Sequence, residues 1–478
     1  MERYDLLVVG SSFAATFFIK KYLEKSSAAA RVLVLERGHF FPHAERLKKE
    51  RGEPSSYSHP ILTAGNTIIN PNEEKTWTFQ IAFGGNSNCW TGCTPRFLPS
   101  DFRLKSLYGV GADWPVSYEE LDPYYDEVET LMSVSGPEHT PFPKKSRYPQ
   151  PPHVFTTVDE VLHKMYGDQY IHQPTARARI AAAGRNPCCV SNSCNLCPGN
   201  AKFTIENSRI GVYEDPRVTI VYGAHVLQLD TAGNQVKKVI YLKDGKEQSA
   251  TADAIALGAN AIFNAQILLA SGDTSPKTGR GIGEQIGIRA VVKLKDFENV
   301  GGSTHVSANG YMLYDGDHRR EAASCLIESS NQPYVRMERG KYRHIAVFRM
   351  VFEDLPDDNN YVRLGSDRLK PEVHYTDFTA YAKKGIERMK EKMPGLLSCL
   401  PVEDIEYHKP FKTESHILGT TRMSTDPREG VVDRHLIHHK YRNLFVLGSG
   451  SFTTYSAANP TLTLSALSLF AADKNFGS

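Results

Sequence analysis

The sequence predicts an α/β fold in which a Rossmann-like domain is interleaved with an α+β part that holds an antiparallel sheet. The chain has 478 residues, which exceeds one ordinary hydrophobic core and favours two interlocked domains. A strand, a helix and a second strand open the chain, and several short apolar strands with turn residues between them follow further along. Together these observations predict one parallel and one antiparallel sheet.

Residues 6–9 are a continuous apolar run that predicts a strand. Phe13, Phe17 and Leu23 then recur at roughly helical spacing, and residues 31–35 form a second apolar strand. This strand–helix–strand unit spans about thirty residues, as one half of a mononucleotide-binding fold requires.

The middle of the chain predicts a less regular architecture. Residues 53–80 are polar and turn-rich and predict a covering loop, and the six prolines within residues 135–153 predict an extended crossing segment. Antiparallel strands are expected at residues 218–222, 226–229 and 238–242, with a turn at Gly233 and Asn234. A strand at 254–257 ends at Gly258, and the remaining predictions are strands at 343–352 and 361–364 and a helix at 378–393 with Phe378, Tyr381, Met389 and Met393 inward.

Composition excludes several classes of protein. Apolar residues at 40% and charged residues at 23% are globular values, and a formal charge of +2 without a basic stripe argues against nucleic-acid binding. The sequence has no run of about 18 consecutive apolar residues, so we expect no transmembrane helix. The N-terminus enters a strand directly rather than a signal peptide. We therefore expect a cytoplasmic protein, or a periplasmic one exported folded with a small partner subunit.

The turn after the first strand carries a partial nucleotide-binding fingerprint. It reads Gly10-Ser-Ser12-Phe13-Ala14-Ala15, where the pattern is G-x-G-x-x-G, so the turn glycine is present and two positions hold small residues instead. Glu36 ends the second strand, 21 positions after Ala15, where a carboxylate can accept both ribose hydroxyls. The alternative is a surface glutamate that pairs with Arg37.

Three runs near the C-terminus place an imidazole, a glycine turn and an amide in a fixed order. They are His416-Ile-Leu-Gly-Thr-Thr-Arg-Met, Asn443-Leu-Phe-Val-Leu-Gly-Ser-Gly and Asn459-Pro-Thr-Leu-Thr-Leu. In their order and their sequence they resemble the C-terminal signature of the glucose–methanol–choline (GMC) flavoprotein oxidoreductases. The glycine-rich segment 83–92 and the strand–turn–helix at 253–269 resemble the flavin loop and the closing element of the same family.

The resemblance runs from residue 4 to the C-terminus and implies the domain boundaries. The FAD-binding domain would comprise residues 1–100, 203–294 and 416–478, and the substrate and cysteine-cluster domain residues 101–202 and 295–415. The residues that the resemblance assigns to FAD are Gly10, Ser12, Phe13, Ala14, Glu36, Arg37, Gly84, Gly85, Asn86, Asn88, Cys89, Trp90, Val226, Gly258, Gly448, Ser449, Pro460 and Thr461.

Within the family, the sequence of these segments is most similar to that of the sugar-oxidising branch. Residues 84–97 look like the flavin loop of pyranose oxidases, whose flavin-linked histidine is replaced here by Cys89, so a histidyl–FAD bond is not expected and a cysteinyl bond is the alternative. Residues 97–102 and 109–115 look like segments of bacterial FAD-dependent glucose and gluconate dehydrogenases and of glucoside 3-dehydrogenases.

The resemblance implies a catalytic pair of His416 and Asn459, 43 residues apart. Oxidising a secondary alcohol on a sugar, glycoside or polyol removes a hydroxyl proton and moves a hydride to flavin N5. Histidine can accept the proton near working pH, and the asparagine amide can orient the alcohol oxygen. His305 is a candidate for the substrate pocket, although a surface histidine at a strand edge is the interpretation that the sequence favours.

Four of the eight cysteines, Cys188, Cys189, Cys194 and Cys197, fall within ten positions. Three interpretations fit them: zinc, free or disulfide-bonded thiols, and an iron–sulfur cluster. The doublet plus Cys194 resembles the three ligands of the [3Fe–4S] cluster in bacterial FAD-dependent glucose dehydrogenases, with Cys197 one position from the family pattern. A cluster would pass electrons to a cytochrome or quinone. The alternative is an oxygen-using oxidase with inert cysteines.

Cys89 and Cys93 lie beside the proposed flavin loop and are expected to be packing residues.

Overall fold

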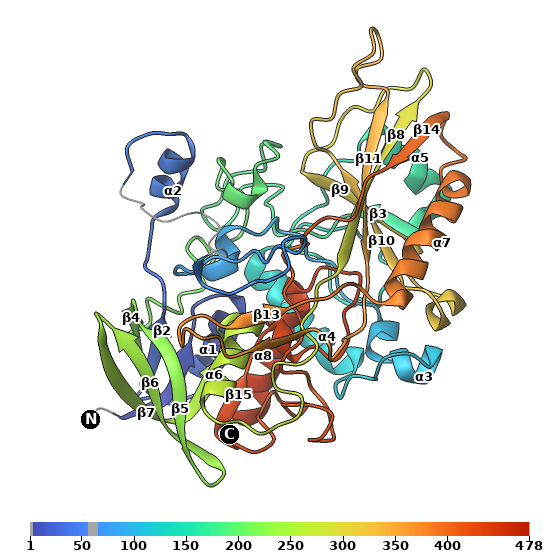
Figure 1. Ribbon diagram of the computed structural model, residues 1–478. Helices are drawn as coiled ribbons and strands as arrows, with labels where there is room; N and C mark the ends of the chain where they lie inside the picture. Colours follow the sequence, from blue (N-terminus) through green and yellow to red (C-terminus); the bar gives the residue numbers. More distant parts are fainter. Residues whose placement is uncertain (1–2, 56–65, 478) are drawn as a thin grey trace.

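The computed structural model describes residues 3–55 and 66–477. Within these residues the chain forms a seven-stranded sheet, a six-stranded sheet and a two-stranded ribbon. Figure 1 shows the two large sheets at opposite ends of the molecule, with the irregular segments between them. The expected loop at 53–80 includes 56–65, which lie outside the described residues. Its later part is irregular, and Ile69 forms a β-bridge with Glu372.

The first sheet is parallel at its centre. Strands β1 (Arg3–Val9) and β2 (Val32–Glu36) flank helix α1 (Phe13–Lys25), which confirms the expected strand–helix–strand unit. Strand β4 (Val218–Tyr222) pairs with β2 in parallel, so the prediction that it is antiparallel is wrong. An apolar run specifies a strand but carries no information on its direction, which depends here on the long segment that returns from the other sheet.

An antiparallel meander extends the same sheet. Strands β5 (His225–Ala232) and β6 (Gln235–Lys243) are joined at Gly233 and Asn234, as predicted, and β7 (Lys246–Leu257) pairs with β6 before it joins β1. Strand β15 (Leu444–Val446) then adds in parallel to β7. Helices α6 (Asn260–Ala270) and α8 (Thr461–Asn475) complete the layer, and α8 packs on α1 and on α4 (Tyr118–Met132).

The second sheet is antiparallel along most of its length. Its order is β14-β8-β11-β10-β9-β3, formed by β14 (Val402–Tyr407), β8 (Ile286–Leu294), β11 (Ile345–Phe352), β10 (Cys325–Ser330), β9 (Val306–Leu313) and β3 (Tyr170–His172). Helix α7 (Ala380–Leu396) covers one face (Figure 1), with Tyr381, Met389 and Met393 buried as expected and Phe378 partly buried just before it. The opposite face turns toward the first sheet.

The remaining elements are short connections. They are α2 (His43–Glu50), α3 (Leu104–Tyr108), α5 (Thr157–Tyr166), the ribbon β12 (Tyr361–Arg363) and β13 (Glu372–His374), and 3₁₀ turns that include Pro99–Phe102 and Asp317–Arg320. Residues 135–153 contain neither helix nor strand, as their prolines predict. In the part of the chain that is described, no helix has the length and apolar character needed to cross a membrane.

A buried ion network joins the two parts of the molecule. The Arg319 guanidinium donates to Glu353 at 2.5 and 3.1 Å and to Asp101 at 2.8 Å, and all three side chains are buried. Asp101 also accepts from Ser456, three residues before Asn459. Burial raises the pKa of Asp101, and the charge of Arg319 lowers it. The arginine therefore makes two otherwise costly carboxylates tolerable in the interior.

Replacing Arg319 by alanine should leave both carboxylates buried and unpaired. We expect a loss of about 3–5 kcal/mol in the free energy of unfolding, measured by denaturant titration of the purified protein. Arg320→Ala is the matched control, because Arg320 is 57% exposed and pairs only loosely with Asp317 at 3.6 Å. Its effect should stay within about 0.5 kcal/mol. Equal losses for the two variants would contradict the assignment.

Candidate active site

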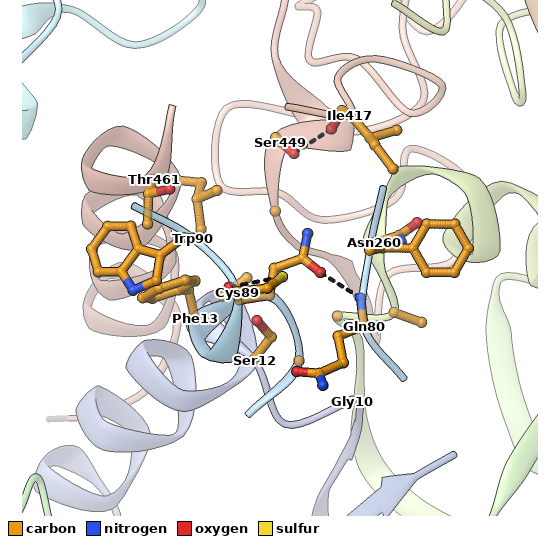
Figure 2. Close-up of a pocket in the computed structure, with 18 of the residues that line it drawn as sticks. Gly10, Ser12, Phe13, Gln80, Cys89, Trp90, Asn260, Ile417, Ser449 and Thr461 are labelled. Carbon is orange, nitrogen blue, oxygen red and sulfur yellow. Dashed lines mark hydrogen bonds between the residues drawn. The ribbon is translucent and has the colours of Figure 1, made fainter. Parts of the chain in front are cut away.

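One cavity runs from the carboxyl ends of β1 and β2 to the inner face of the six-stranded sheet. Its lining begins at the turn that follows Val9, passes residues 78–93 and the start of α6, and ends at Glu328 of β10 and Arg349 of β11. Ligands of open parallel sheets bind at such carboxyl ends. Figure 2 shows Phe13 and Trp90 near Thr461 on one side of this cavity and Asn260 on the other.

The turn at Gly10 has no room for a side chain. Its φ is +93°, and a Cβ there would lie 2.7 Å from the Gly258 carbonyl oxygen. Helix α1 begins directly after Ser12, so its first backbone N–H groups lie at the cavity. A helix N-terminus of this kind stabilises phosphate. The geometry therefore fits a dinucleotide pyrophosphate, although Ser12 stands where the fingerprint has glycine.

Ser11 ties three nucleotide-binding segments together. Its hydroxyl donates to Glu36 at 2.6 Å and accepts from the backbone N–H of Gly84 at 3.0 Å. Glu36 also accepts from the N–H of Gly38 at 2.7 Å and is buried, so the interpretation as a surface glutamate is wrong. Burial raises the pKa of Glu36, and the Ser11 and Gly38 hydrogen bonds lower it. Arg37 lines the cavity, with its guanidinium 5.0 Å from the centre of the Phe263 ring.

The predicted FAD residues gather around this cavity with two exceptions. Those that line it are Gly10, Ser12, Phe13, Ala14, Glu36, Arg37, Gly85, Asn86, Cys89, Trp90, Val226, Gly258, Gly448, Ser449, Pro460 and Thr461. Gly84 and Asn88 belong to the glycine-rich segment 83–92 but do not line the cavity. The Asn88 side chain instead donates to the Phe83 carbonyl at 2.8 Å. Cys89 and Cys93 line the cavity as well, so neither is only a packing residue.

His416 and Asn459 face the same cavity. The ring N–H at Nδ1 of His416 donates to Gln285 Oε1 at 2.7 Å, and Gln285 Nε2 donates to the carbonyls of Ser456 and Ala458, both at 2.8 Å. Because the Gln285 nitrogen is committed to two carbonyl oxygens, its oxygen must be the atom that faces the imidazole. Nδ1 is then the protonated nitrogen, and Nε2 is left as the basic one.

The cavity keeps His416 neutral. Burial, together with the smaller effect of the nearby Arg349 charge, lowers its pKa to about 3. Asn459 is buried, and its side chain hydrogen-bonds the Glu328 carboxyl. Within the described chain its Oδ1 is buried and has no hydrogen-bond partner. A neutral base therefore lies beside a buried amide whose oxygen remains able to accept a hydrogen bond.

Several residues of the site escaped sequence reasoning. They are Ser11, Gln285, Glu328, Arg349 and Glu414. A charged residue inside an otherwise apolar strand is a usable signal, and both Cys325–Ser330 and Ile345–Phe352 contain one. His305 is buried and lines the cavity, with Nδ1 2.9 Å from Asn192 Oδ1, so its interpretation as a surface histidine is wrong.

The structure does not assemble the four predicted metal ligands. Cys194 and Cys197 are buried, Cys188 is half-buried near Thr304, and Cys189 is exposed beside Gly199. All four are free thiols, and among the described residues no group of three or more histidine, cysteine or acidic side chains is arranged to hold a metal ion. The adjacent residues 188 and 189 direct their thiols to different neighbours, which separates them.

Comparison with known proteins identifies the family. Residues 356–468 match the C-terminal domain model of the GMC oxidoreductases. The chain is 30% identical to the fructose dehydrogenase large subunit of Gluconobacter japonicus, over 82% of this chain and 79% of that protein. The chain belongs to the GMC oxidoreductase family. As a GMC flavoprotein it takes FAD, and the tight turn at Gly10, the buried Glu36 and the long cavity fit that cofactor.

Other proteins resemble the chain over nearly its whole length. The chain is 26% identical to 2-methyl-1,2-propanediol dehydrogenase of Mycolicibacterium austroafricanum, over 99% of this chain and 95% of that protein. Pyridoxine 4-oxidase from Mesorbium loti superimposes with a TM-score of 0.66 at 16% identity, covering 99% of each chain. This last likeness concerns the fold alone.

Gln285→Leu should slow flavin reduction by alcohol about 10- to 100-fold, because it removes the acceptor that fixes the His416 tautomer.

The proposed base, His416, must be neutral to accept a proton. With a pKa of about 3, His416 should cause no loss of rate until the pH falls below about 4. Stopped-flow reduction rates measured from pH 4 to 8 check both points. A loss of rate near pH 6 that occurs in both wild type and Glu414→Ala would contradict this role; the second variant is needed because Glu414 has a pKa of about 7. An unaffected Gln285→Leu variant with full FAD content would contradict it as well.

Proposed function

We propose that this enzyme uses FAD to oxidise a secondary alcohol on a sugar, glycoside or polyol. The observation that carries the proposal is the single cavity, which has the nucleotide-binding turn at one end and His416 with Asn459 at the other. The polar side chains of Glu328, Arg349 and Glu414 line the same space, which suits a substrate with several hydroxyl groups.

The two catalytic side chains have separate tasks. His416 Nε2 accepts the proton of the substrate hydroxyl, and Gln285 keeps the imidazole in the tautomer that can do so. Asn459 holds the alcohol oxygen in place through its amide. The bound flavin supplies the hydride acceptor at N5.

The proposed substrate class agrees with the relatives. The names of the fructose and 2-methyl-1,2-propanediol dehydrogenases describe enzymes that act on a sugar and on a diol. A small-molecule polyol is therefore the expected substrate. The subunit designation of the fructose dehydrogenase supports a partner that receives electrons or assists export, such as a cytochrome subunit or a small export subunit.

We also propose that the cysteine segment is an iron–sulfur site, with [3Fe–4S] the expected cluster. Two buried cations support an anionic group there. In the described chain, Arg177 hydrogen-bonds to hydroxyl, amide, carbonyl and thiol groups, and Lys202 to the carbonyls of Asn88, Trp90 and Asn195. Burial lowers the pKa of Lys202 to about 8, and the nearby thiols of Cys89, Cys194 and Cys197 oppose that shift.

Among the described residues, the thiols of Cys188, Cys189, Cys194 and Cys197 are not arranged to bind a metal ion together. The reaction steps given above do not involve a cluster. The second candidate is therefore an oxygen-using pyranose or glycoside oxidase without a cluster. The separation of Cys188 from Cys189 favours this alternative. In that case the acceptor would be oxygen and the product hydrogen peroxide.

A substrate panel under anaerobic conditions tests the alcohol oxidation. D-Fructose, D-glucose, D-gluconate, methyl β-D-glucoside and myo-inositol should be compared, and at least one should bleach the flavin. His416→Ala should slow that bleaching by about 10²- to 10⁴-fold while FAD stays bound, because a general base is lost. Unchanged bleaching in the variant would defeat the assignment of the base. Oxygen uptake and peroxide formation, set against reduction of an artificial acceptor, separate oxidase from dehydrogenase.

Iron and acid-labile sulfide analysis tests the cluster. After anaerobic purification we expect both elements in the proportion of a [3Fe–4S] cluster, and Cys194→Ser should lose them. Cys399→Ser is the matched control, because Cys399 is a half-buried thiol after α7, in another part of the sequence. Absence of both elements from the wild-type protein would remove the relay and leave the oxidase alternative.

A further inference from the structure

Four strands of the six-stranded sheet place polar side chains in one row that includes the cavity wall. Asn309 of β9 pairs with Glu328 of β10, Glu328 with Arg349 of β11, and Arg349 with Arg289 of β8. Directly opposed residues of an antiparallel sheet share a face. On that face Leu326 and Val351 pack into the core of the first sheet, whereas the alternate residues of β10 and β11 pack against α7.

Arg349 and Glu414 form an ion pair at the cavity wall. Arg349 Nη2 donates to Glu414 Oε2, and the guanidinium lies 5.0 Å from the centre of the Phe411 ring, which fixes its plane. The pair leaves two buried atoms, Arg349 Nε and Glu414 Oε1, that have no hydrogen-bond partner in the part of the chain described. One is a donor and the other an acceptor. An unsatisfied buried donor and acceptor are costly unless a ligand completes them.

Glu414 is held closely against the sheet. An ideal Cβ on Gly287 of β8 would fall 1.4 Å from Glu414 Oε1, so a side chain at 287 would displace the carboxyl group. Glu414 is also only two residues before His416, and both line the same cavity. The ion pair therefore lies within one substrate length of the base.

The charges around the pair do not favour a charged substrate. Two carboxyl groups, Glu414 and Glu328, face the single guanidinium of Arg349, so no positive charge is left over for a substrate carboxylate. Burial raises the pKa of Glu414 to about 7 and also raises the pKa of Glu328, whereas the nearby charge of Arg349 lowers both. Both carboxyl groups therefore already face the guanidinium, which leaves no free counter-charge for a substrate ammonium. The three imidazoles that line the cavity, His225, His305 and His416, are kept neutral by burial.

On the basis of the proposed function, we propose that Arg349 and Glu414 form a subsite for two adjacent hydroxyl groups of a neutral sugar or polyol, next to the carbon that is oxidised. A vicinal diol would offer one acceptor oxygen to the Arg349 guanidinium, whose side chain is 34% exposed, and one O–H donor to the Glu414 carboxyl at the cavity wall. The subsite would thus select substrates by a hydroxyl pair that takes no part in the redox step.

Deoxy analogues test the subsite in the holoenzyme. The probes are D-glucose, D-fructose and myo-inositol, each beside its monodeoxy derivatives, and the readouts are kcat and KM for an artificial acceptor and the absorbance change on binding to the oxidised flavin. In wild type, removing a subsite hydroxyl should lower kcat/KM about 10- to 100-fold, mainly through KM, as expected for a hydrogen bond to a charged group away from the reacting carbon.

Arg349→Lys and Glu414→Ala should abolish the difference in kcat/KM between a parent compound and its deoxy derivative. The parent compound loses a hydrogen bond in each variant, whereas the deoxy derivative has none to lose. Gly287→Ala should do the same by displacing Glu414 while both charged side chains remain. Arg289→Ala is the matched control. Arg289 occupies the next position of the row and lies 5.4 Å from the Phe411 ring, but it does not line the cavity, so the discrimination should persist.

Four results would overturn the subsite. The first is discrimination that survives in Arg349→Lys and Glu414→Ala. The second is tighter binding of D-gluconate than of D-glucose that the neutral replacement Arg349→Met removes. The third is tighter binding of D-glucosamine than of D-glucose that Glu414→Ala removes. The fourth is the absence of any absorbance change with all neutral probes. Binding without flavin bleaching would refute the proposed oxidation instead, and the subsite would still be judged by the binding data.

Discussion

The hydrogen bonds of Gln285 hold together the part of the cavity where we propose that the alcohol reacts. This one side chain lies just before β8 of the six-stranded sheet and contacts His416 on one side and the backbone of Ser456 and Ala458 on the other. It therefore fixes the imidazole and the segment that leads into Asn459 in a common frame. The Asp101–Arg319 network supports the same segment through Ser456. A reaction centre assembled from distant parts of the chain needs such shared anchors, because small displacements of a reacting group are costly.

The buried arginines and lysines of this enzyme fall into two groups. Arg96 and Arg319 are surrounded by carboxylates that neutralise them, as expected of charges that serve the fold. Arg177 and Lys202 instead hydrogen-bond to neutral groups, and both lie between the flavin loop and the cysteine segment. Positive charge that the described side chains do not neutralise is therefore concentrated on one side of the cofactor cavity, where it can stabilise negative charge.

The sequence predicted those parts of the structure that local patterns determine. The first strand–helix–strand unit, the β5–β6 turn and helix α7 follow from apolar spacing and turn residues. Glu36 could be placed by its spacing from the turn, and His416 and Asn459 by the order of the C-terminal runs. The direction of β4 was wrong because apolar runs do not encode it. The domain boundaries drawn from the sequence stay predictions.

The parts that escaped prediction depend on contacts between distant segments. Ser11 gains its role only because Glu36 and Gly84 converge on it, and Gln285 only because two C-terminal carbonyls face it. The row from Asn309 to Arg289 depends on strand register, which no local pattern in β9, β10 or β11 specifies. The arrangement of the cysteine side chains likewise depends on what surrounds them rather than on their spacing.

Lys202 couples the stability of two neighbouring segments. Its ammonium group binds carbonyls of the flavin loop and of the cysteine segment at once, so neither segment can leave its place without breaking bonds of the other. Segments linked in this way unfold as one cooperative unit. Backbone amides of the two segments should therefore exchange with solvent at matched rates, and damage to the thiols would loosen the grip on the cofactor.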